Sequence, residues 1–291
     1  MFLLLFSTVL LVALIFWLSK RASADPYGEF HLALNKLPGE GDPQTEWLNM
    51  GYWKDTTVFP RACEALALKL AQAAGCKHGG QVLDVGHGSG ESLVFLLTHP
   101  SVARPSQLTG ITSLKAHHKR SQMRVARLEQ PVPVALHAGD AIYRPGCQGH
   151  PLDPSSEGQF DTILALDCAY HFQPRTDFLR QAYAKLRPGG SLALADICFA
   201  PGALKTRWTR CVTAVLRLMP RANMVSTDEY VAQLRGIGYA DVRLEDVSAD
   251  VFPGFIRFLR TRGMGWKTFG ALLAVYAGAG ARFVVVAGRR A

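Results

Sequence analysis

Residues 82–90, with the sequence VLDVGHGSG, constrain the fold more than any other part of this 291-residue chain. An apolar strand runs directly into a glycine-rich turn, and residues 91–98 then have the composition of a short helix. Gly86, Gly88 and Gly90 lack a Cβ, so the turn can close tightly and its backbone can approach a ligand. The helix N-terminus behind the turn offers unpaired N–H groups and a partial positive charge. This unit predicts a nucleotide or nucleoside site at the carboxyl ends of parallel strands.

The glycine spacing distinguishes between classes of nucleotide site. A dinucleotide fingerprint, GxGxxG, needs its third glycine one place later, where the chain has Glu91. A phosphate-binding P-loop needs Gly-Lys-Ser or Gly-Lys-Thr after the turn, and neither follows. Glycine-rich turns also occur where nothing binds, so the type of site depends on the rest of the chain.

Strand and helix patterns alternate after the glycine turn. The strands are predicted at 107–112, 132–137, 160–166 and 191–197, and the helices between them at 114–129 and 175–186. Strands separated by segments of helix length favour a parallel sheet covered on both faces. Residues 241–247 and 282–287 are expected to form an antiparallel hairpin at the edge. The expected fold is therefore α/β and Rossmann-like, with a mostly parallel seven-stranded sheet, helices on both faces and an antiparallel C-terminal edge strand.

The first residues have a different composition. Residues 2–18 carry no charge, and Lys20 and Arg21 follow directly. A stretch of about 17 residues is at the short end for a membrane helix, and flanking basic residues favour the cytosolic side. We therefore expect residues 1–18 to be an N-terminal transmembrane helix with the catalytic part facing the cytosol, at the endoplasmic reticulum membrane. The Ala-Ser-Ala sequence at 22–24 keeps the alternative of a cleaved signal and the secretory pathway open.

The remaining chain is divided by composition. Residues 19–45 are rich in proline and glycine and are predicted to be a linker, and residues 46–291 form the catalytic domain. Substrate-covering helices are expected around 200–265. Within them, residues 203–219 give an amphipathic helix with basic residues outside the apolar stripe. This helix is expected to pack on the core, to cover the substrate pocket or to lie on a membrane.

Charge and cysteine content exclude some classes of partner. The formal net charge is +9, but the basic residues are scattered and form no run typical of nucleic-acid binding, so no nucleic-acid partner is expected. The six cysteines form no CxxC pair, which suits a reducing compartment. No residue spacing predicts a metal site.

Polar residues follow the ends of the predicted strands. Each acid taken alone would be an ordinary helix cap or turn residue. Together they lie at the carboxyl ends of adjacent parallel strands, where α/β proteins bind ligands. The residues are Asp84, Thr112, Ser113, Asp140, Asp167, His171 and Asp196.

These segments carry a resemblance to a known family. The chain resembles class I S-adenosylmethionine-dependent methyltransferases over roughly residues 45–200, through VLDVGHGSG, GDA at 139–141, FDTILALDCAYHF at 160–172 and LRPGGSLALADI at 186–197. NMGYW at 49–53 and GITS at 110–113 are similar to the small-molecule subgroup, which includes sterol, tocopherol, glycine-betaine and macrolide- or sugar-O-methyltransferases. The resemblance implies S-adenosyl-L-methionine as cofactor and methyl transfer as the activity.

The resemblance also implies roles for residues around the methionine part of the cofactor. Asp84, Gly86, Gly88 and Gly90 would surround it. Asp167 would close the site on the side of the fourth strand. Carboxylates suit a sulfonium cation on electrostatic grounds.

Further roles concern the nucleoside. Thr112 and Ser113 would lie near the ribose, and Asp140 would accept from the adenine amino group with Ala141 beside the ring. Many class I enzymes have an acidic residue at the end of the second strand, and a hydroxyl cannot match a bidentate carboxylate. His87, inside the glycine loop, is a second departure, because alanine, cysteine or threonine is commoner there.

The last implied roles concern the reaction itself. Tyr52 and Trp53 would cover the methyl-sulfonium end, since an aromatic face attracts a cation. Similar O-methyltransferases place a histidine after the fourth strand and an aspartate after the fifth. His171 is therefore the predicted general base, and Asp196 is predicted to orient it or to share the role.

The resulting expectation is an S-adenosylmethionine-dependent transferase that methylates a hydroxyl of a lipophilic small molecule, in secondary metabolism, while anchored to a membrane. Carbon or nitrogen methylation of a sterol, quinone or amine lipid is the first alternative, because an alkene or amine could react without His171. A non-catalytic cofactor-binding partner protein is the second.

Overall fold

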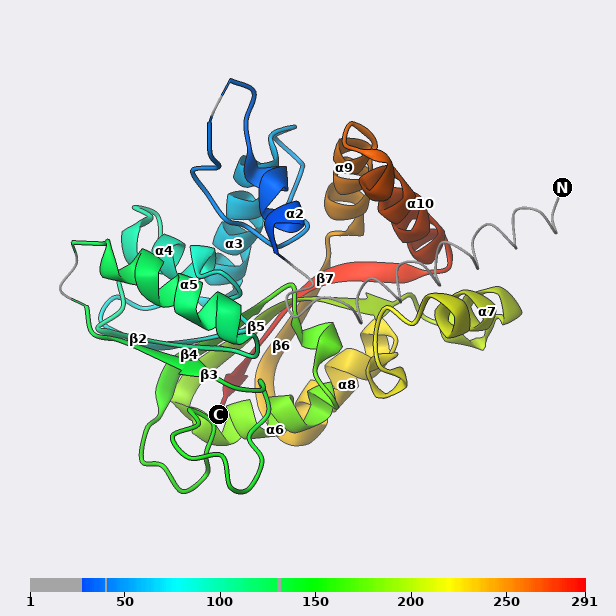
Figure 1. Cartoon of the computed structure of the whole chain (residues 1–291). Helices are drawn as coiled ribbons and strands as arrows, with labels where there is room; N and C mark the ends of the chain where they lie inside the picture. The colour runs from blue at the N-terminus through cyan, green and yellow to red at the C-terminus, as the bar shows by residue number, and fades with distance from the viewer. Residues whose placement is uncertain (1–27, 40, 130–131) are drawn as a thin grey trace, which may run out of the picture.

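A seven-stranded sheet forms the centre of the computed structural model, which describes residues 28–39, 41–129 and 132–291. The strand order is β3-β2-β1-β4-β5-β7-β6 (Figure 1). β1 pairs in parallel with β2 and β4, β2 with β3 and β4 with β5, whereas β7 is antiparallel to both β5 and β6. The strands are β1 (Gln81–Val85), β2 (Gln107–Thr112), β3 (Val134–Ala138), β4 (Phe160–Leu166), β5 (Leu186–Phe199), β6 (Tyr239–Asp246) and β7 (Ala281–Arg290).

Helices cover both faces of the sheet. α3, α4 and α5 lie on one face together with α9 and α10, and α6 and α8 lie on the other (Figure 1). Residues 207–216, α7, extend beyond the strand ends (Figure 1). The α-helices are α2 (Glu29–Leu32), α3 (Phe59–Ala74), α4 (Glu91–Thr98), α5 (Lys115–Ala126), α6 (Arg175–Lys185), α7 (Arg207–Leu216), α8 (Thr227–Ile237), α9 (Ser248–Arg260) and α10 (Met264–Gly278).

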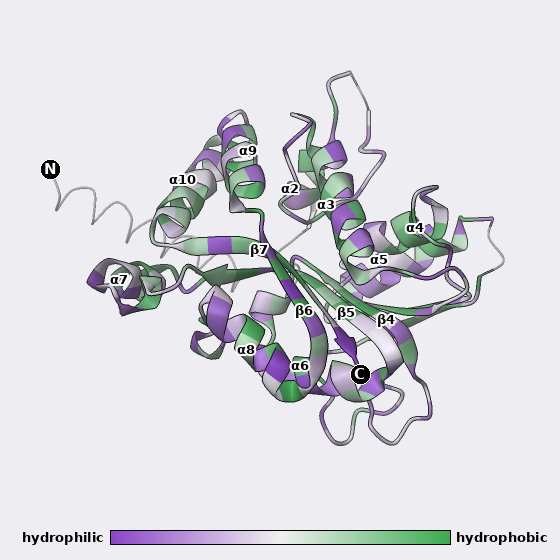
Figure 2. Ribbon diagram, turned by 180° about the vertical axis from the view of Figure 1, so that it is seen from behind, coloured by the Kyte–Doolittle hydropathy of each residue, from purple (hydrophilic) through white to green (hydrophobic). Residues whose placement is uncertain are grey.

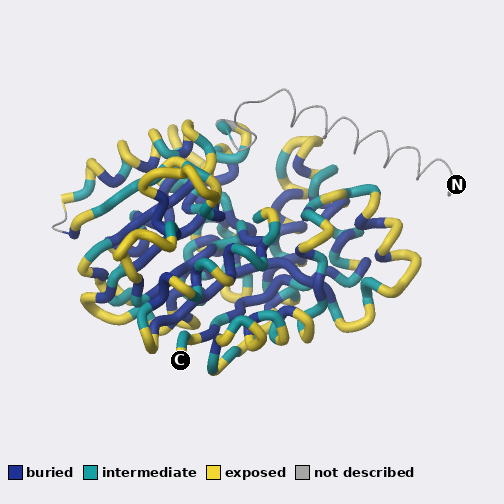
Figure 3. Tube along the Cα trace, turned by 90° about the horizontal axis from the view of Figure 1, so that it is seen from below, coloured by how far each residue is buried: buried dark blue, intermediate teal, exposed yellow. Residues whose placement is uncertain are grey.

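The central strands are buried on both sides, as Figure 3 shows for the interior of the trace. In β4, Ile163 and Ala165 pack into the cluster under α6 and α8, and Leu164 packs into the opposite cluster under α3. Successive strand residues point to opposite faces, so a strand covered by helices on both sides must be apolar throughout. This explains why the predicted strands read as continuous apolar runs.

The structure confirms the Rossmann-like α/β sheet with its antiparallel pair at the edge. Within that pair, β7 lies inside, between β5 and β6. The apolar residues 270–286 are divided between α10 and β7, and the turn between them contains Gly280 at φ 98°. α9 and α10 pack against each other, and Figure 2 shows hydrophobic and hydrophilic residues side by side on both helices.

The expectation of a membrane-spanning protein requires correction. Across the three described ranges, every helix is too short or too polar to cross a bilayer. The predicted anchor, residues 1–18, lies outside the described residues. The transmembrane helix, the membrane partner and the single-pass location facing the cytosol are therefore not supported.

The strand order places the ligand crevice. The chain runs outward through β1, β2 and β3, then returns to place β4 on the other side of β1. The loops after β1 and β4 therefore leave the sheet toward opposite faces and open a crevice between them. The glycine turn follows β1, and Asp167 follows β4.

Candidate active site

The glycine turn after β1 adopts backbone conformations that favour glycine. Gly86, Gly88 and Gly90 have φ angles of 79°, 56° and 94°. A Cβ on Gly90 would lie 2.7 Å from the Cβ of Ser121, and one on Gly86 would lie 2.6 Å from the Sγ of Cys168. The turn is therefore packed tightly between α5 and the loop after β4, which keeps its backbone in one place.

Two buried carboxylates flank the crevice. Asp84 accepts a 2.5 Å hydrogen bond from the Ser92 Oγ, and Asp167 accepts a 2.7 Å hydrogen bond from the Met50 amide. Burial raises the pKa of Asp84 to about 6 and that of Asp167 to about 8. Among the described residues neither forms an ion pair, and the Asp167 Oδ1 is buried without a hydrogen-bond partner. Carboxylates in this state favour a ligand that brings positive charge and N–H donors.

The segment 49–53 closes over the Asp167 side of the crevice. The Met50 amide bonds Asp167, and the Met50 carbonyl accepts a 2.7 Å hydrogen bond from the Trp53 indole. The Gly51 amide donates to the Asn49 side chain at 2.9 Å. The sequence pattern did not single out Met50, because its contribution is a backbone amide that any residue would offer.

Tyr52 and Trp53 pack beside the crevice on α3 and α9. The Tyr52 ring lies under the Lys69 ammonium at 5.1 Å, and burial together with Asp250 raises the pKa of Tyr52 to about 12. The Trp53 ring lies 5.3 Å from that of Phe258. These contacts explain how both aromatic side chains are held in place. Their predicted role of covering a sulfonium stays a prediction.

The ends of β2 and β3 carry the residues predicted to bind the nucleoside. Thr112 is buried, and Ser113 beyond it is exposed. Asp140 is exposed, and its carboxylate accepts a 2.9 Å hydrogen bond from the Ile142 amide. Ala141 between them is buried. The four predicted residues therefore lie at the expected strand ends, and their individual contacts to ribose and adenine stay predictions.

His87 is an internal part of the glycine turn. Its Nδ1 lies 3.1 Å from the Gly88 carbonyl oxygen, and its buried Nε2 has no partner among the described residues. Burial lowers its pKa to about 4, so the ring is neutral near pH 7. A Cβ on Gly110 would lie 2.8 Å from the His87 Cδ2, so this glycine of β2 leaves the space that the imidazole occupies. This packing is the physical account of the unusual histidine.

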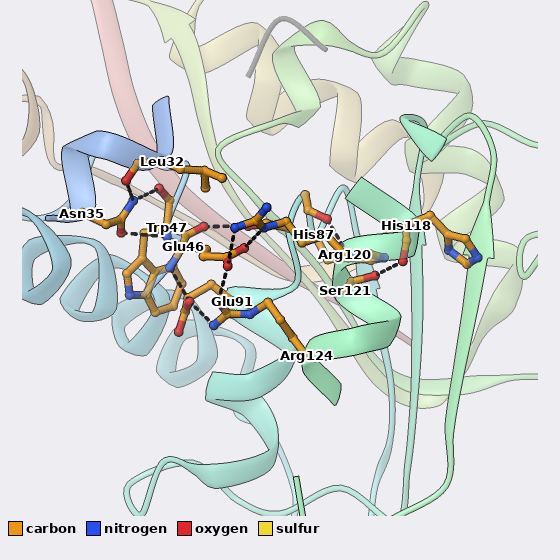
Figure 4. A network of polar contacts seen from close by, with 12 residues as sticks. Leu32, Asn35, Glu46, Trp47, His87, Glu91, His118, Arg120, Ser121 and Arg124 are labelled. Atoms are coloured by element: carbon orange, nitrogen blue, oxygen red, sulfur yellow. Dashed lines mark hydrogen bonds and ion pairs between the residues drawn. The ribbon is translucent and has the colours of Figure 1, made fainter. Parts of the chain in front are cut away.

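A network of charges holds residues 46–47 above the glycine turn (Figure 4). The Glu46 carboxylate pairs with Arg120 at 2.5 Å and with Arg124 at 2.9 Å, and Arg124 also pairs with Glu91. The Ser89 hydroxyl donates to the Glu46 carbonyl at 2.6 Å. Burial by itself would raise the pKa of Glu46. The hydrogen bond from Arg120 and the charge of Arg124 outweigh this effect and hold the pKa below its usual value. We call the four charged residues of this network, Glu46, Glu91, Arg120 and Arg124, the clamp. The sequence did not predict it, because its members are ordinary charged residues far apart in the chain.

His171 ends the short 3₁₀ helix η2 (Ala169–His171) and is exposed. Its ring lies against Tyr170, with the ring centroids 4.2 Å apart. It lines an open hollow of about 520 Å³ together with residues from the end of α7 and from 218–224. A histidine at this position can contact a molecule bound in the hollow.

Asp196 is fully buried in β5 and has its own partners. Its Oδ2 pairs with Arg175 at 2.7 Å and accepts a 2.7 Å hydrogen bond from the Tyr230 hydroxyl. The Arg175 guanidinium also lies 4.0 Å above the Tyr230 ring. The contacts of Asp196 thus join β5 to α6 and α8. Its predicted action on His171 stays a prediction.

A methyltransferase-domain family model matches residues 52–244, which is more than half of the chain. The chain belongs to this methyltransferase family. The match begins inside NMGYW and ends within β6, so it includes the glycine turn, both crevice carboxylates and η2.

Curated relatives of this methyltransferase modify small molecules. It is 28% identical over 245 residues to erythromycin 3''-O-methyltransferase of Saccharopolyspora erythraea, covering 80% of this chain and 75% of the relative. It is 30% identical over 234 residues to 27-O-demethylrifamycin SV methyltransferase of Amycolatopsis mediterranei, and the match covers 79% of this chain and 78% of the relative. It is similar in fold to geranyl diphosphate C-methyltransferase of Streptomyces coelicolor, with a TM-score of 0.66 at 16% identity over 92% of this chain and 99% of the other.

The cofactor of this methyltransferase is S-adenosylmethionine, which solved relatives bind as such or as S-adenosylhomocysteine. The residues present fit it. The Oδ1 of Asp167, which has no hydrogen-bond partner among the described residues, and the carboxylate of Asp84, bonded to Ser92 alone, suit a cofactor that carries an ammonium group and a sulfonium. When bound, the cofactor supplies an electrophilic methyl group. Asp84, Asp167 and the glycine turn would hold its methionine part.

Proposed function

We propose that this methyltransferase acts on a hydroxyl oxygen of a lipophilic small molecule and that His171 is the general base. The observation that carries the proposal is the place of His171, four residues after Asp167 and on the wall of the 520 Å³ hollow. Leu218, Met219 and Met224 line the same hollow and offer apolar surface. The two curated relatives, erythromycin 3''-O-methyltransferase and 27-O-demethylrifamycin SV methyltransferase, agree with oxygen as the acceptor atom.

The chemistry assigns a separate task to each side of the site. A bound cofactor would supply the methyl carbon to the acceptor oxygen and would keep the electron pair of the carbon–sulfur bond on its sulfur. The hydroxyl proton would pass to the imidazole of His171, which becomes imidazolium and then releases the proton to water. The rest of the rate enhancement comes from holding donor and acceptor in line, which is the task of the tightly packed glycine turn and of the hollow.

The test is the replacement of His171. Labelled S-adenosylmethionine and a cell extract would first identify the methylated product, and kcat would then be measured for His171→Ala and His171→Gln. We expect kcat to fall by about a hundredfold or more in both, with cofactor affinity unchanged, and the acidic limb of the pH–rate profile to disappear. His78→Ala, on an exposed histidine away from the hollow, is the matched control.

Near-normal turnover by His171→Ala would remove the assignment of the base. A product methylated on carbon or nitrogen would replace O-methylation by the first alternative, because such acceptors need no base of this kind. An acceptor that is freely water-soluble and lacks an apolar part would contradict the lipophilic substrate.

A further inference from the structure

Two adjoining hollows lie along α7 and the following 3₁₀ helix η4 (Arg221–Asn223). One measures about 690 Å³, and the other is the 520 Å³ hollow of His171. Both are lined by Thr213, Ala214, Arg221 and Met224, so they share a wall, and we treat them together as one depression. We call this depression the basic groove, after its four arginines, Arg207, Arg210, Arg217 and Arg221.

Among the described residues, no acidic side chain offsets the charge of the basic groove. No aspartate or glutamate of the described ranges lines either hollow. In the part of the chain that the structure describes, the guanidinium groups of Arg207, Arg210 and Arg221 have no hydrogen-bond or ion-pair partner, whereas that of Arg217 donates to the Ala214 carbonyl at 3.2 Å. Most other arginines of the site region are paired, as Arg120, Arg124 and Arg175 show. Unpaired guanidinium groups around one depression favour an oxyanion, which they can bind through two parallel hydrogen bonds.

The basic groove is held firmly against η2. The Asn223 side-chain amide donates to the carbonyls of Tyr170 and Phe172 at 2.9 and 2.6 Å, and its oxygen accepts from the Arg175 amide at 2.9 Å. Tyr170 and Phe172 are the two neighbours of His171 in the chain. The backbone at Arg221 is therefore held at a set separation from the backbone at His171, so a molecule that contacts both side chains does not have to order these two segments against each other.

The lining also contains an apolar part. Leu204 and Cys211 lie in the larger hollow, Leu218 and Met219 lie near His171, and Met224 is common to both. A ligand that fits this mixture has an apolar body and an anionic group. A neutral acceptor would leave the guanidinium groups solvated by water, so the arginines would add nothing to its affinity.

We propose that the basic groove binds an oxyanion of the acceptor molecule, a carboxylate or a phosphate, while the acceptor's reacting atom lies at His171. This inference rests on the proposed function, because it assumes that the acceptor occupies the hollow of His171. It goes further in naming the chemical class of the acceptor: an amphiphilic small molecule with one anionic end. Arg207, Arg210 and Arg221 recognise that end, and the methionines and leucines contact the body.

A binding experiment tests the groove without any turnover. The full chain would be titrated calorimetrically with decyl phosphate, decanoate and decanol, below the concentrations at which they form micelles. We expect the two anions to bind at least about tenfold more tightly than decanol, whose tail is identical, and this preference to weaken with salt. The ratio of decyl phosphate to decanoate affinity separates a phosphate-bearing acceptor from a carboxylate-bearing one.

Substitutions locate the binding. Arg207→Gln/Arg221→Gln should lose the preference for the anions, by about tenfold or more, while binding of S-adenosylmethionine is unchanged. Arg235→Gln, on an exposed arginine of α8 outside both hollows, removes one charge elsewhere and should leave the preference intact. Equal affinity for decanol and the anions, or an equal loss in Arg235→Gln, would overturn the proposal.

A second readout uses the acceptor itself. Products labelled from an extract would be separated on an anion exchanger, and the label is expected in the retained fraction. Arg221→Gln should then raise KM for that acceptor by about tenfold with little change in kcat. Label only in the neutral fraction would overturn the anionic acceptor while leaving methyl transfer in place. Anion binding without any methyl transfer would instead support the anion site in the basic groove and contradict the proposed function.

Discussion

The carboxylate of Asp167 accepts a hydrogen bond from the Met50 amide at 2.7 Å, between residues 117 positions apart in the sequence. The contact ties NMGYW to the end of β4 and uses one carboxylate oxygen, while the other stays buried without a partner among the described residues. The protein thus keeps a buried acid half satisfied at the crevice where its cofactor binds. Such a group costs stability in the free protein and becomes favourable when a cation arrives.

The first prediction concerns pH and stability without cofactor. Burial raises the pKa of Asp167 from 3.8 to about 8, so the folded protein keeps a proton that the unfolded chain releases. The contribution of Asp167 to stability is therefore full below pH 3.8 and is lost as pH rises through about 8. We expect Asp167→Asn, which still accepts from Met50, to gain about 1–2 kcal/mol over the wild type at pH 8 and nothing at pH 4.

Urea unfolding across this pH range measures the effect. Asp42→Asn, on an exposed aspartate, is the control and should follow the wild-type curve. Parallel pH dependences for Asp167→Asn and the wild type would contradict the assignment. The same substitution should weaken cofactor binding by about tenfold, measured calorimetrically, because the charge that faces the cofactor is gone.

The second prediction concerns the buried pair of Arg175 and Asp196. Arg175→Met leaves the Asp196 carboxylate buried without its counter-charge, and we expect a loss of about 3 kcal/mol in the free energy of unfolding. Adding Asp196→Asn removes the uncompensated charge, so the double variant should be more stable than Arg175→Met alone. Denaturant unfolding of the four proteins gives the coupling. Additive losses would show that the two residues do not act as a pair.

The third prediction tests the space that Gly110 leaves for His87. A Cβ on Gly110 would lie 2.8 Å from the His87 ring and 2.9 Å from the Leu136 Cδ2. Gly110→Ala should therefore lower stability by about 1–3 kcal/mol. Gly236→Ala in α8, where a Cβ meets open space, should instead raise it by about 0.5–1 kcal/mol. Thermal unfolding compares the two, and equal effects would mean that His87 adapts to the added methyl group.

The fourth prediction addresses the clamp over the glycine turn. Arg124→Met removes the partner shared by Glu46 and Glu91, both of which are largely shielded from water. We expect a loss of about 1–3 kcal/mol in stability and a weaker affinity for S-adenosylmethionine, since the turn loses its cover. Arg127→Met, one turn further along and exposed, should change neither quantity. Unaltered cofactor affinity in Arg124→Met would show that the clamp serves folding alone.

The order of strands and helices was predictable because each buried strand is a short apolar run followed by a turn. The 82–90 unit and the antiparallel β6–β7 pair lie as expected, whereas residues 187–190, predicted to form a turn before the fifth strand, are part of β5. The inner position of β7 was not predictable, because pairing partners are set by three-dimensional packing that periodicity does not record. The predicted anchor at 1–18 rested on an uncharged apolar stretch and on the basic residues that follow it, and it lies outside the described residues.

The positions of Asp84, Asp167 and His171 around the crevice were predictable, because polar residues at the ends of parallel strands meet at one edge of the sheet, and their individual roles stay predictions. The site was not predictable where the contact is made by backbone or by dispersed charges, as for Met50 and Glu46. Asp196 shows a third case. A sequence reveals an acid at the end of a strand, but its pairing with Arg175 and Tyr230 depends on helices that approach from elsewhere.

Asn223 has a consequence for how such an enzyme can diversify. One amide side chain joins η4, beside the basic groove, to the loop that carries His171. If the basic groove holds the acceptor as proposed, residues on α7 can be exchanged without moving the loop of His171, because Asn223 alone makes these two hydrogen bonds. Recognition of the acceptor and its reaction would then be separable traits, and a change in one helix would open the enzyme to new acceptors.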